Sequence, residues 1–371
     1  MSILGWLSQS HGSPKHCGLT HPVVVCLLHY AIVISTTIAV HDYLVIPALD
    51  YNNNDYYAYK DFRREGWTFS VSQCSNETRI TDEEQPQIEK HTYISQFLAL
   101  YFLFLLTARL LGEVGIARTG AIYGFTWLCN TAMVFSVIGI ETCRPLLGSS
   151  SAVAVSIDQV LWYVDIIGWV LSGCRKFPIG VAKYLTWPQT TWVTKVTCTH
   201  HLWCIPLLIY GSYGMHYAAY PLSTYIVASH VILSRWLTPF KIIPCLVDGN
   251  NDKKKFSNNK NNNNGSKFKR VTNFMCGTPS IFPDPSNTTS FPNKIKLKEM
   301  ERYCNVNLSH ELWSDIQFSQ LRTSTDTAPD GATYILRLLS WWNGIFNLIT
   351  FCLLYLLGRF FLGKATVYKH P

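Results

Sequence analysis

Residues 93–112 read YISQFLALYFLFLLTARLLG, and the only charged side chain in this stretch is Arg109. A helix of about 20 apolar residues is long enough to cross the roughly 30 Å hydrocarbon core of a bilayer. Similar runs recur along the chain, at about 22–40, 93–112, 119–140, 153–173, 197–213, 217–236 and 335–362. The sequence therefore predicts an all-α fold, a polytopic transmembrane helical bundle of about seven spans.

The composition agrees with a membrane protein. Of the 371 residues, 48% are hydrophobic and 14% are aromatic, and many aromatics fall at the edges of the apolar runs, where interfacial belts place them. The net charge is +8, but the Lys and Arg residues collect in a few loops, where they fix topology. We therefore expect a membrane lipid as partner and no nucleic acid. The 12 cysteines form no CxxC pair and are interpreted mainly as small apolar residues.

The apolar runs divide the chain into three parts. Residues 1–240 form a membrane domain with spans one to six and a lumenal loop at 41–92. That loop carries ten acidic and five basic residues and a sequon at Asn76, which favour the lumenal side and predict glycosylation of Asn76. Residues 241–334 are predicted to be a mostly disordered, basic and polar cytosolic insert, and residues 335–371 the last transmembrane helix and tail.

The insert contains seven basic residues from Lys253 to Arg270 among repeated asparagines. Such a composition is typical of a solvated linker, and the basic residues would also bind anionic lipid headgroups at the cytosolic leaflet. The sequons at Asn287 and Asn307 should then remain unused. On the lumenal side, Cys74 and Cys143 are a candidate disulfide, with chance placement as the alternative.

Two adjacent histidines lie in the fifth apolar run. Residues 196–210 read VTCTHHLWCIPLLIY and include His200 and His201. Ionisable side chains are costly in a bilayer and usually mark function. If the spans alternate in direction, Asp165 of span four lies near the same depth. A carboxylate beside an imidazole raises its basicity, so we predict a general base at His200 or His201, oriented by Asp165. Alternatively, the histidines only join neighbouring helices, and Asp165 pairs with a basic residue.

A substrate-binding pocket is predicted among spans four to six. The residues expected to contribute to it are Asp158, Tyr163, Trp203 and His230. Asp158 precedes Asp165 by two helical turns and lies on roughly the same helix face. Histidine spacings typical of metal sites, such as HxxxH, HxxHH and HExxH, do not occur. The sequence thus predicts neither a metal site nor another cofactor.

Three short elements resemble a known family. Trp162–Asp165 (WYVD), Thr199–Leu202 (THHL) and Leu237–Phe240 (LTPF) resemble elements of the TLC family, which includes the TRAM, longevity-assurance and CLN8 proteins. The resemblance covers residues 162–240 and departs from the family pattern at Ser234–Trp236, where an acidic residue is common. It implies a lipid-handling protein of the endoplasmic reticulum or another endomembrane. Because some members are N-acyltransferases, it also implies acyl-CoA as a co-substrate.

These observations leave three functions open. The first is a lipid-modifying enzyme, with acyl transfer as its reaction. The second is a non-catalytic lipid-binding or regulatory membrane protein with the same pocket. The third is a proton-coupled transporter or channel that uses buried aspartates and histidines.

Overall fold

The structure is a computed structural model of the chain. It describes residues 20–51, 85–113, 115–142, 144–187, 190–212, 216–239, 241–242, 302–303, 307, 309 and 331–361. Within these residues, every regular element is helical except one two-residue antiparallel ladder, in which β1 (Lys241–Ile242) pairs with β2 (Arg302–Tyr303). The helical fold class predicted from the apolar runs is therefore confirmed.

Several apolar runs form long, nearly continuous helices. The first run forms α2 (Thr20–Val40), η1 (His41–Val45) and α3 (Ile46–Tyr51), and the last forms α16 (Gly331–Leu339), η5 (Ser340–Asn347) and α17 (Leu348–Phe361). Between them lie α6 (Gln85–Gly112), α7 (Gly115–Gly124), α8 (Leu128–Glu141), α9 (Pro145–Leu171), η2 (Lys183–Thr186), α10 (Trp192–Thr197), α11 (His200–Ser212) and α12 (Ala219–Leu237).

Four helical segments are long and apolar enough to cross a membrane. They are Pro22–Leu49, Tyr93–Gly112, Leu146–Leu171 and Thr333–Leu356, and a fifth arises if α7 and α8, which are bent by 45°, count as one span. Seven spans are not confirmed. The predicted fifth span is only a 13-residue helix, α11, about 20 Å long at 1.5 Å per residue. The predicted sixth, α12, carries His, Arg, Ser and Thr side chains that lower its hydropathy.

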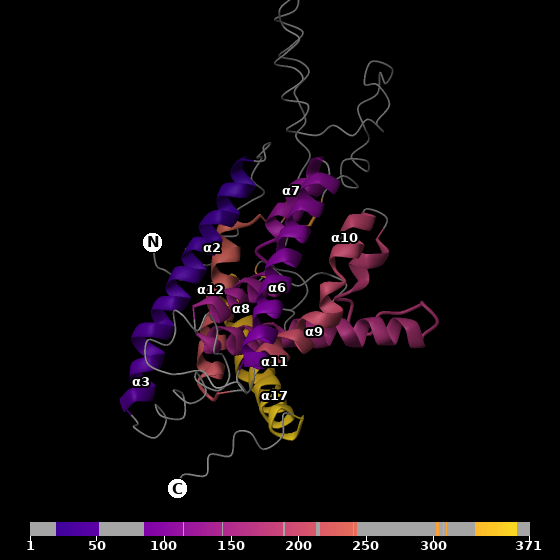
Figure 1. Ribbon diagram of the computed structural model, residues 1–371. Coiled ribbons are helices and arrows are strands. Elements are labelled where there is room, and N and C mark those ends of the chain that lie inside the picture. Colours follow the sequence, from indigo (N-terminus) through magenta and orange to yellow (C-terminus); the bar gives the residue numbers. More distant parts are fainter. Residues whose placement is uncertain are drawn as a thin grey trace, which may run out of the picture.

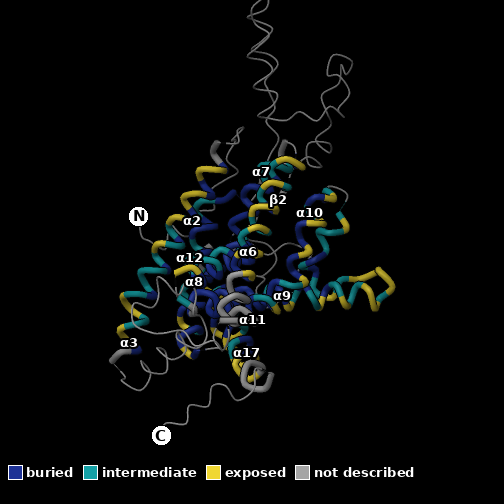
Figure 2. Tube along the Cα trace, in the orientation of Figure 1, coloured by how far each residue is buried: buried dark blue, intermediate teal, exposed yellow. Residues whose placement is uncertain are grey.

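Exposed residues lie along the outer helices (Figure 2), and many of them are large and apolar. On α9, Val160, Val164, Ile167 and Leu171 follow the i, i+4, i+7 and i+11 spacing of one face and are all exposed. The exposed residues Phe97, Leu100, Leu103, Phe104 and Leu111 lie on α6. Extensive exposed apolar faces are rare on soluble monomers, so these faces fit contact with lipid tails.

Helix α9 is central to the bundle and contacts α8, α11 and α12; beyond these neighbours its C-terminal part extends outward (Figure 1). Its first half is rich in small residues, and Ser149, Ser150 and Ser151 are fully buried. Small residues allow helices in membranes to approach closely. At Gly139 of α8, an added Cβ would lie 2.9 Å from the Arg144 carbonyl oxygen, so this corner requires glycine.

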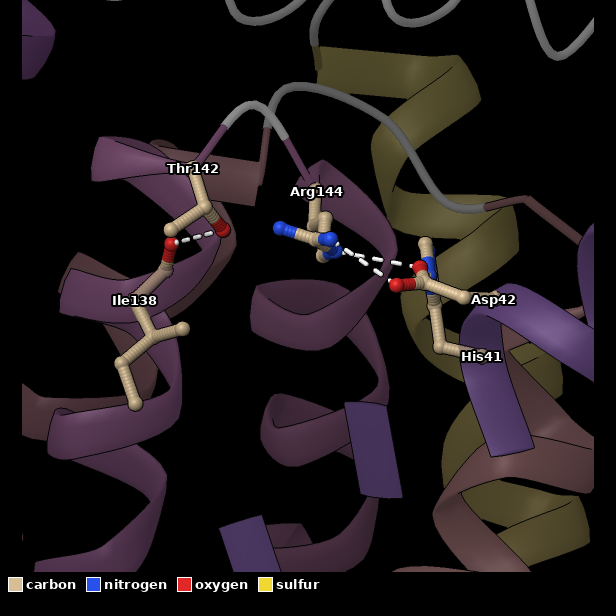
Figure 3. A network of polar contacts seen from close by, with 5 residues as sticks. All are labelled: His41, Asp42, Ile138, Thr142 and Arg144. Carbon is tan, nitrogen blue, oxygen red and sulfur yellow. Dashed lines mark hydrogen bonds and ion pairs between the residues drawn. The ribbon is translucent and has the colours of Figure 1, made fainter. Parts of the chain in front are cut away.

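The predicted lumenal loop 41–92 is shorter than expected at both ends, because helix continues to Tyr51 and resumes at Gln85. At this end of the bundle, Asp42 of η1 accepts two hydrogen bonds from Arg144, from Nε at 3.1 Å and from Nη2 at 2.8 Å (Figure 3). His41 Nδ1 lies 2.6 Å from the same carboxylate. This partly exposed network joins the first helix to the α8–α9 corner.

Two residues from the predicted insert enter the bundle. Asn307 Oδ1 accepts from the backbone N–H of Leu128, and its Nδ2 donates to the Thr126 carbonyl and to Ser234 Oγ. Asn307 thus acts as the missing cap of α8, whose own N-cap, Trp127, makes no side-chain cap bond. The carbonyl of Ser309 accepts from Arg235 of α12. The insert is therefore anchored to the bundle at these described positions.

Several sequence predictions fall outside the described residues. They are glycosylation of Asn76, the Cys74–Cys143 disulfide, lipid binding by Lys253–Arg270 and the state of Asn287. These remain predictions.

Candidate functional site

The candidate site lies where a two-residue turn separates two consecutive helices. α10 ends at Thr197 and α11 begins at His200, with Cys198 and Thr199 in a turn between them. The backbone N–H of His201 donates to the carbonyl of Cys198, three residues earlier, at 3.1 Å. In an α-helix it would donate to the carbonyl of Thr197, four residues earlier. The Thr197 carbonyl is therefore left without its helical partner, as at any helix end.

His200 satisfies that carbonyl and thereby adopts a defined tautomer. Its Nδ1 lies 2.7 Å from the Thr197 oxygen, and since a carbonyl can only accept, Nδ1 carries the hydrogen. Tyr101 of α6 donates to the same oxygen at 3.1 Å. In a neutral imidazole the other nitrogen, Nε2, then has a free lone pair. This backbone carbonyl takes the orienting role that we predicted for Asp165.

His201 lies in a stack of three rings. Its ring centroid is 4.3 Å from that of His200 and 5.3 Å from that of Trp162 on α9, with interplanar angles of 29° and 17°. Successive helical residues diverge by about 100°, but at the first turn of α11 both rings stay together. The side chains are 1% exposed for His200 and 8% for His201.

A third residue completes the cluster from another helix. Cys129 of α8 is buried, and its sulfur lies within 4.8 Å of one ring nitrogen of each histidine. Within the described residues, His200 Nε2 and His201 Nδ1 have no hydrogen-bond partner. Leaving a buried polar atom unpaired costs about 1–3 kcal/mol, so two such atoms on neighbouring residues whose rings stack require a physical explanation.

One positive charge lies beside this cluster. Arg109 of α6 is 8% exposed, donates from Nε to Thr197 Oγ1 at 2.9 Å, and approaches Cys198 Sγ from Nη2 at 3.7 Å. Tyr184, from the loop after α9, donates its hydroxyl to the same sulfur at 3.1 Å. Burial, with the neighbouring Cys198, raises the pKa of Tyr184 well above its ordinary value, so its hydroxyl keeps its hydrogen. No carboxylate within the described residues forms an ion pair with Arg109.

Asp165 lies in a different environment from the one predicted. It is fully buried, and its two carboxylate oxygens accept four hydrogen bonds of 2.7–3.0 Å from the backbone N–H groups of Ile179, Gly180 and Ala182. These bonds hold the 172–187 loop against α9. Pro178 packs so closely on α9 that a Cβ on Gly168 would lie 2.2 Å from its ring.

Two of the predicted pocket residues adjoin the histidines. Tyr163 donates to the Leu202 carbonyl at 3.3 Å, and Trp203 packs edge-on against Tyr101 with a centroid distance of 4.6 Å. Asp158, partly buried, lies close enough to Cys129 to affect it electrostatically.

His230 lies apart from this cluster. Its ring centroid is 5.1 Å from that of His29 on α2, and its Nδ1 lies 2.8 Å from the Ile226 carbonyl. The structure therefore separates His230, which lies beside His29, from the His200–His201 pair.

Sequence reasoning missed Cys129 and Arg109. Cys129 falls among the cysteines that are interpreted as small apolar residues, and Arg109 stands out in the sequence only as the single charge of residues 93–112. The available signal was local: Cys198, His200 and His201 together form the compact pattern CTHH. Nothing local indicated that Cys129 would meet it.

Comparisons with family models, curated proteins and solved structures find no match to this chain. The resemblance to the TLC family therefore stays a prediction.

Proposed function

We propose that this chain is a multi-pass membrane protein that acts on a membrane lipid at the His200–His201 pair, with acyl transfer as the reaction. The single observation that supports this most is the oriented, neutral His200 with a free Nε2 lone pair in a helical bundle. An imidazole held in one tautomer is suited to accept a proton from a hydroxyl or amine.

In this reaction His200 Nε2 accepts the proton as the substrate oxygen or nitrogen attacks the acyl carbonyl. The acyl group then leaves its donor, for which the TLC resemblance suggests acyl-CoA, and the proton passes to the departing thiolate. The Thr197 carbonyl stabilises the Nδ1–H of the imidazolium formed in between. Arg109, which is not paired with a carboxylate among the described residues, favours negative charge nearby.

The proposal includes a topology of about seven spans. In it, α10 and α11 together form the fifth span, from Trp192 to Ser212, which is broken at Cys198–Thr199. Non-helical backbone at membrane depth is tolerated where protein groups satisfy it, as Tyr101 and His200 do here. The proposed location is the endoplasmic reticulum or another endomembrane, as the TLC resemblance implies.

The test is quantitative lipidomics on cells that express the wild type, the His200→Ala/His201→Ala double variant, or Lys195→Ala. Lys195 is exposed one turn before the pair and serves as the matched control. A lipid class that rises with the wild type and the control but not with the double variant supports the proposal.

Two other outcomes would change the function. If all proteins bind the same lipid in a labelled-lipid assay and none changes lipid composition, the protein binds lipid without turnover. If neither binding nor turnover is found, proton-coupled transport through Asp158 and His230 becomes the function to measure.

A further inference from the structure

We propose that Cys129 Sγ, His200 Nε2 and His201 Nδ1 bind a transition-metal ion of the zinc class. The three residues come from two helices that are far apart in sequence, α8 and α11, and the Cys129 sulfur and one ring nitrogen of each histidine lie within 4.8 Å of one another. The ion's proposed role in lipid turnover rests on the function proposed above, whereas metal binding itself does not.

The donor atoms have the electronic state that a metal requires. His200 donates Nδ1–H to the Thr197 carbonyl, which is the common arrangement behind a metal-bound histidine, because it fixes the tautomer and makes the other nitrogen more basic. His200 Nε2 and His201 Nδ1 are both buried without a hydrogen-bond partner. A bound cation would pair both of these lone pairs at once.

The distances suit a small ion after minor adjustment. Zinc binds sulfur at about 2.3 Å and nitrogen at about 2.0 Å, which places neighbouring ligand atoms of a tetrahedron about 3.5 Å apart. The candidate donors lie within 4.8 Å of one another, so rotations of the two imidazole rings and of the thiol would bring them to ligand distance. The stack of Trp162 on His201 restrains that ring near its present position.

A metal-bound cysteine is deprotonated, so the ion itself must supply most of the charge that stabilises a Cys129 thiolate. Arg109 lies close enough to Cys129 to act in the same sense, whereas negative charge on Asp158, Cys198 or Cys204 would oppose it.

A thiolate with two imidazoles selects zinc or another thiophilic transition metal over Mg²⁺ and Ca²⁺, which prefer oxygen ligands. Three protein ligands leave one position open, as in catalytic zinc sites.

An ion at this position would change how the lipid reaction is activated. His200 would be a ligand rather than the proton acceptor, and the ion would polarise the acyl carbonyl or lower the pKa of a bound hydroxyl.

The experiment measures metal content directly. Full-length protein carrying a histidine-free affinity tag is purified in detergent, equilibrated with Zn²⁺, desalted and analysed by inductively coupled plasma mass spectrometry. We expect about one ion per chain for the wild type and at least a tenfold loss in Cys129→Ser and His200→Gln. Cys26→Ser is the matched control, because Cys26 on α2 is also a buried thiol but is not one of the three clustered residues, and it donates to the Ile122 carbonyl of α7 at 2.9 Å. Equal zinc content in the wild type and Cys129→Ser would overturn the proposal.

A second measurement keeps the test decisive if a variant fails to accumulate. Co²⁺ replaces Zn²⁺ in the wild type, and a thiolate-to-cobalt charge-transfer band is expected. A wild-type spectrum without that band would overturn the assignment of Cys129.

The two proposals fail separately. Zinc bound without a lipid product refutes the lipid function alone, and a lipid product together with equal zinc content in the wild type and Cys129→Ser refutes the metal site alone.

Discussion

Replacing Asp165 by alanine should release the 172–187 loop from α9. The substitution removes four hydrogen bonds and leaves the buried N–H groups of Ile179, Gly180 and Ala182 without their acceptor. A hydrogen bond to a charged group contributes about 1.5–3 kcal/mol, but bonds that share one carboxylate are not additive. We therefore expect the free energy of local opening to fall by about 3–4 kcal/mol.

Limited trypsin proteolysis measures that opening. Lys183 follows Ala182 directly and begins η2, so cleavage after it requires the loop to open. Where opening is fast relative to cleavage, the rate follows the population of the open form, and 3–4 kcal/mol corresponds to a rate increase of more than about 100-fold. Asp158→Ala, on the same helix two turns earlier, is the control and should leave the rate unchanged.

The same variant separates a structural from a catalytic role of Asp165. A cleavage rate in Asp165→Ala within about threefold of the wild type would refute the loop-anchoring argument. Loss of a lipid product with an unchanged cleavage rate would instead support the orienting role predicted from the sequence.

Three further substitutions test the packing of the bundle. Asn307→Ala removes three buried hydrogen bonds, including the cap of α8. It should lower the stability by about 2–3 kcal/mol, measured as a lower Tm in detergent. An unchanged Tm would contradict the capping role. Gly139→Ala places a Cβ 2.9 Å from a backbone oxygen and should lower the stability by about 1–3 kcal/mol, read as Tm in the same assay. Gly344→Ala is the control, since nothing lies within 4 Å of its Cβ, and should leave Tm unchanged. Equal shifts in Tm would argue against the tight corner at Gly139. Arg144→Ala breaks an ion pair whose side chains are 30% and 33% exposed, so the loss should stay below about 1 kcal/mol; a larger drop in Tm would show that the network in Figure 3 supports the fold.

The sequence predicted the helices better than the spans. Apolar length identified every long helix among the described residues, because burial in lipid or protein requires the same unbroken apolar run. The break at Cys198–Thr199 inside the predicted fifth span was not predictable, since neither Gly nor Pro lies at it. Asn307 lies in the insert that is predicted to be mostly disordered, and nothing in its polar surroundings indicates that its amide completes the backbone of α8.

The sequence by itself determined which segments are apolar and that His200 and His201 would lie within one of them. The tertiary structure decided their partners. It places Cys129 beside the two histidines, and it pairs Asp165 with backbone N–H groups of the loop after α9. A sequence pattern reports the environment along one helix, whereas the atoms that meet depend on how each helix is rotated and crossed against its neighbours. Those rotations depend on close contacts such as Gly139 and Gly168, and no local pattern encodes them.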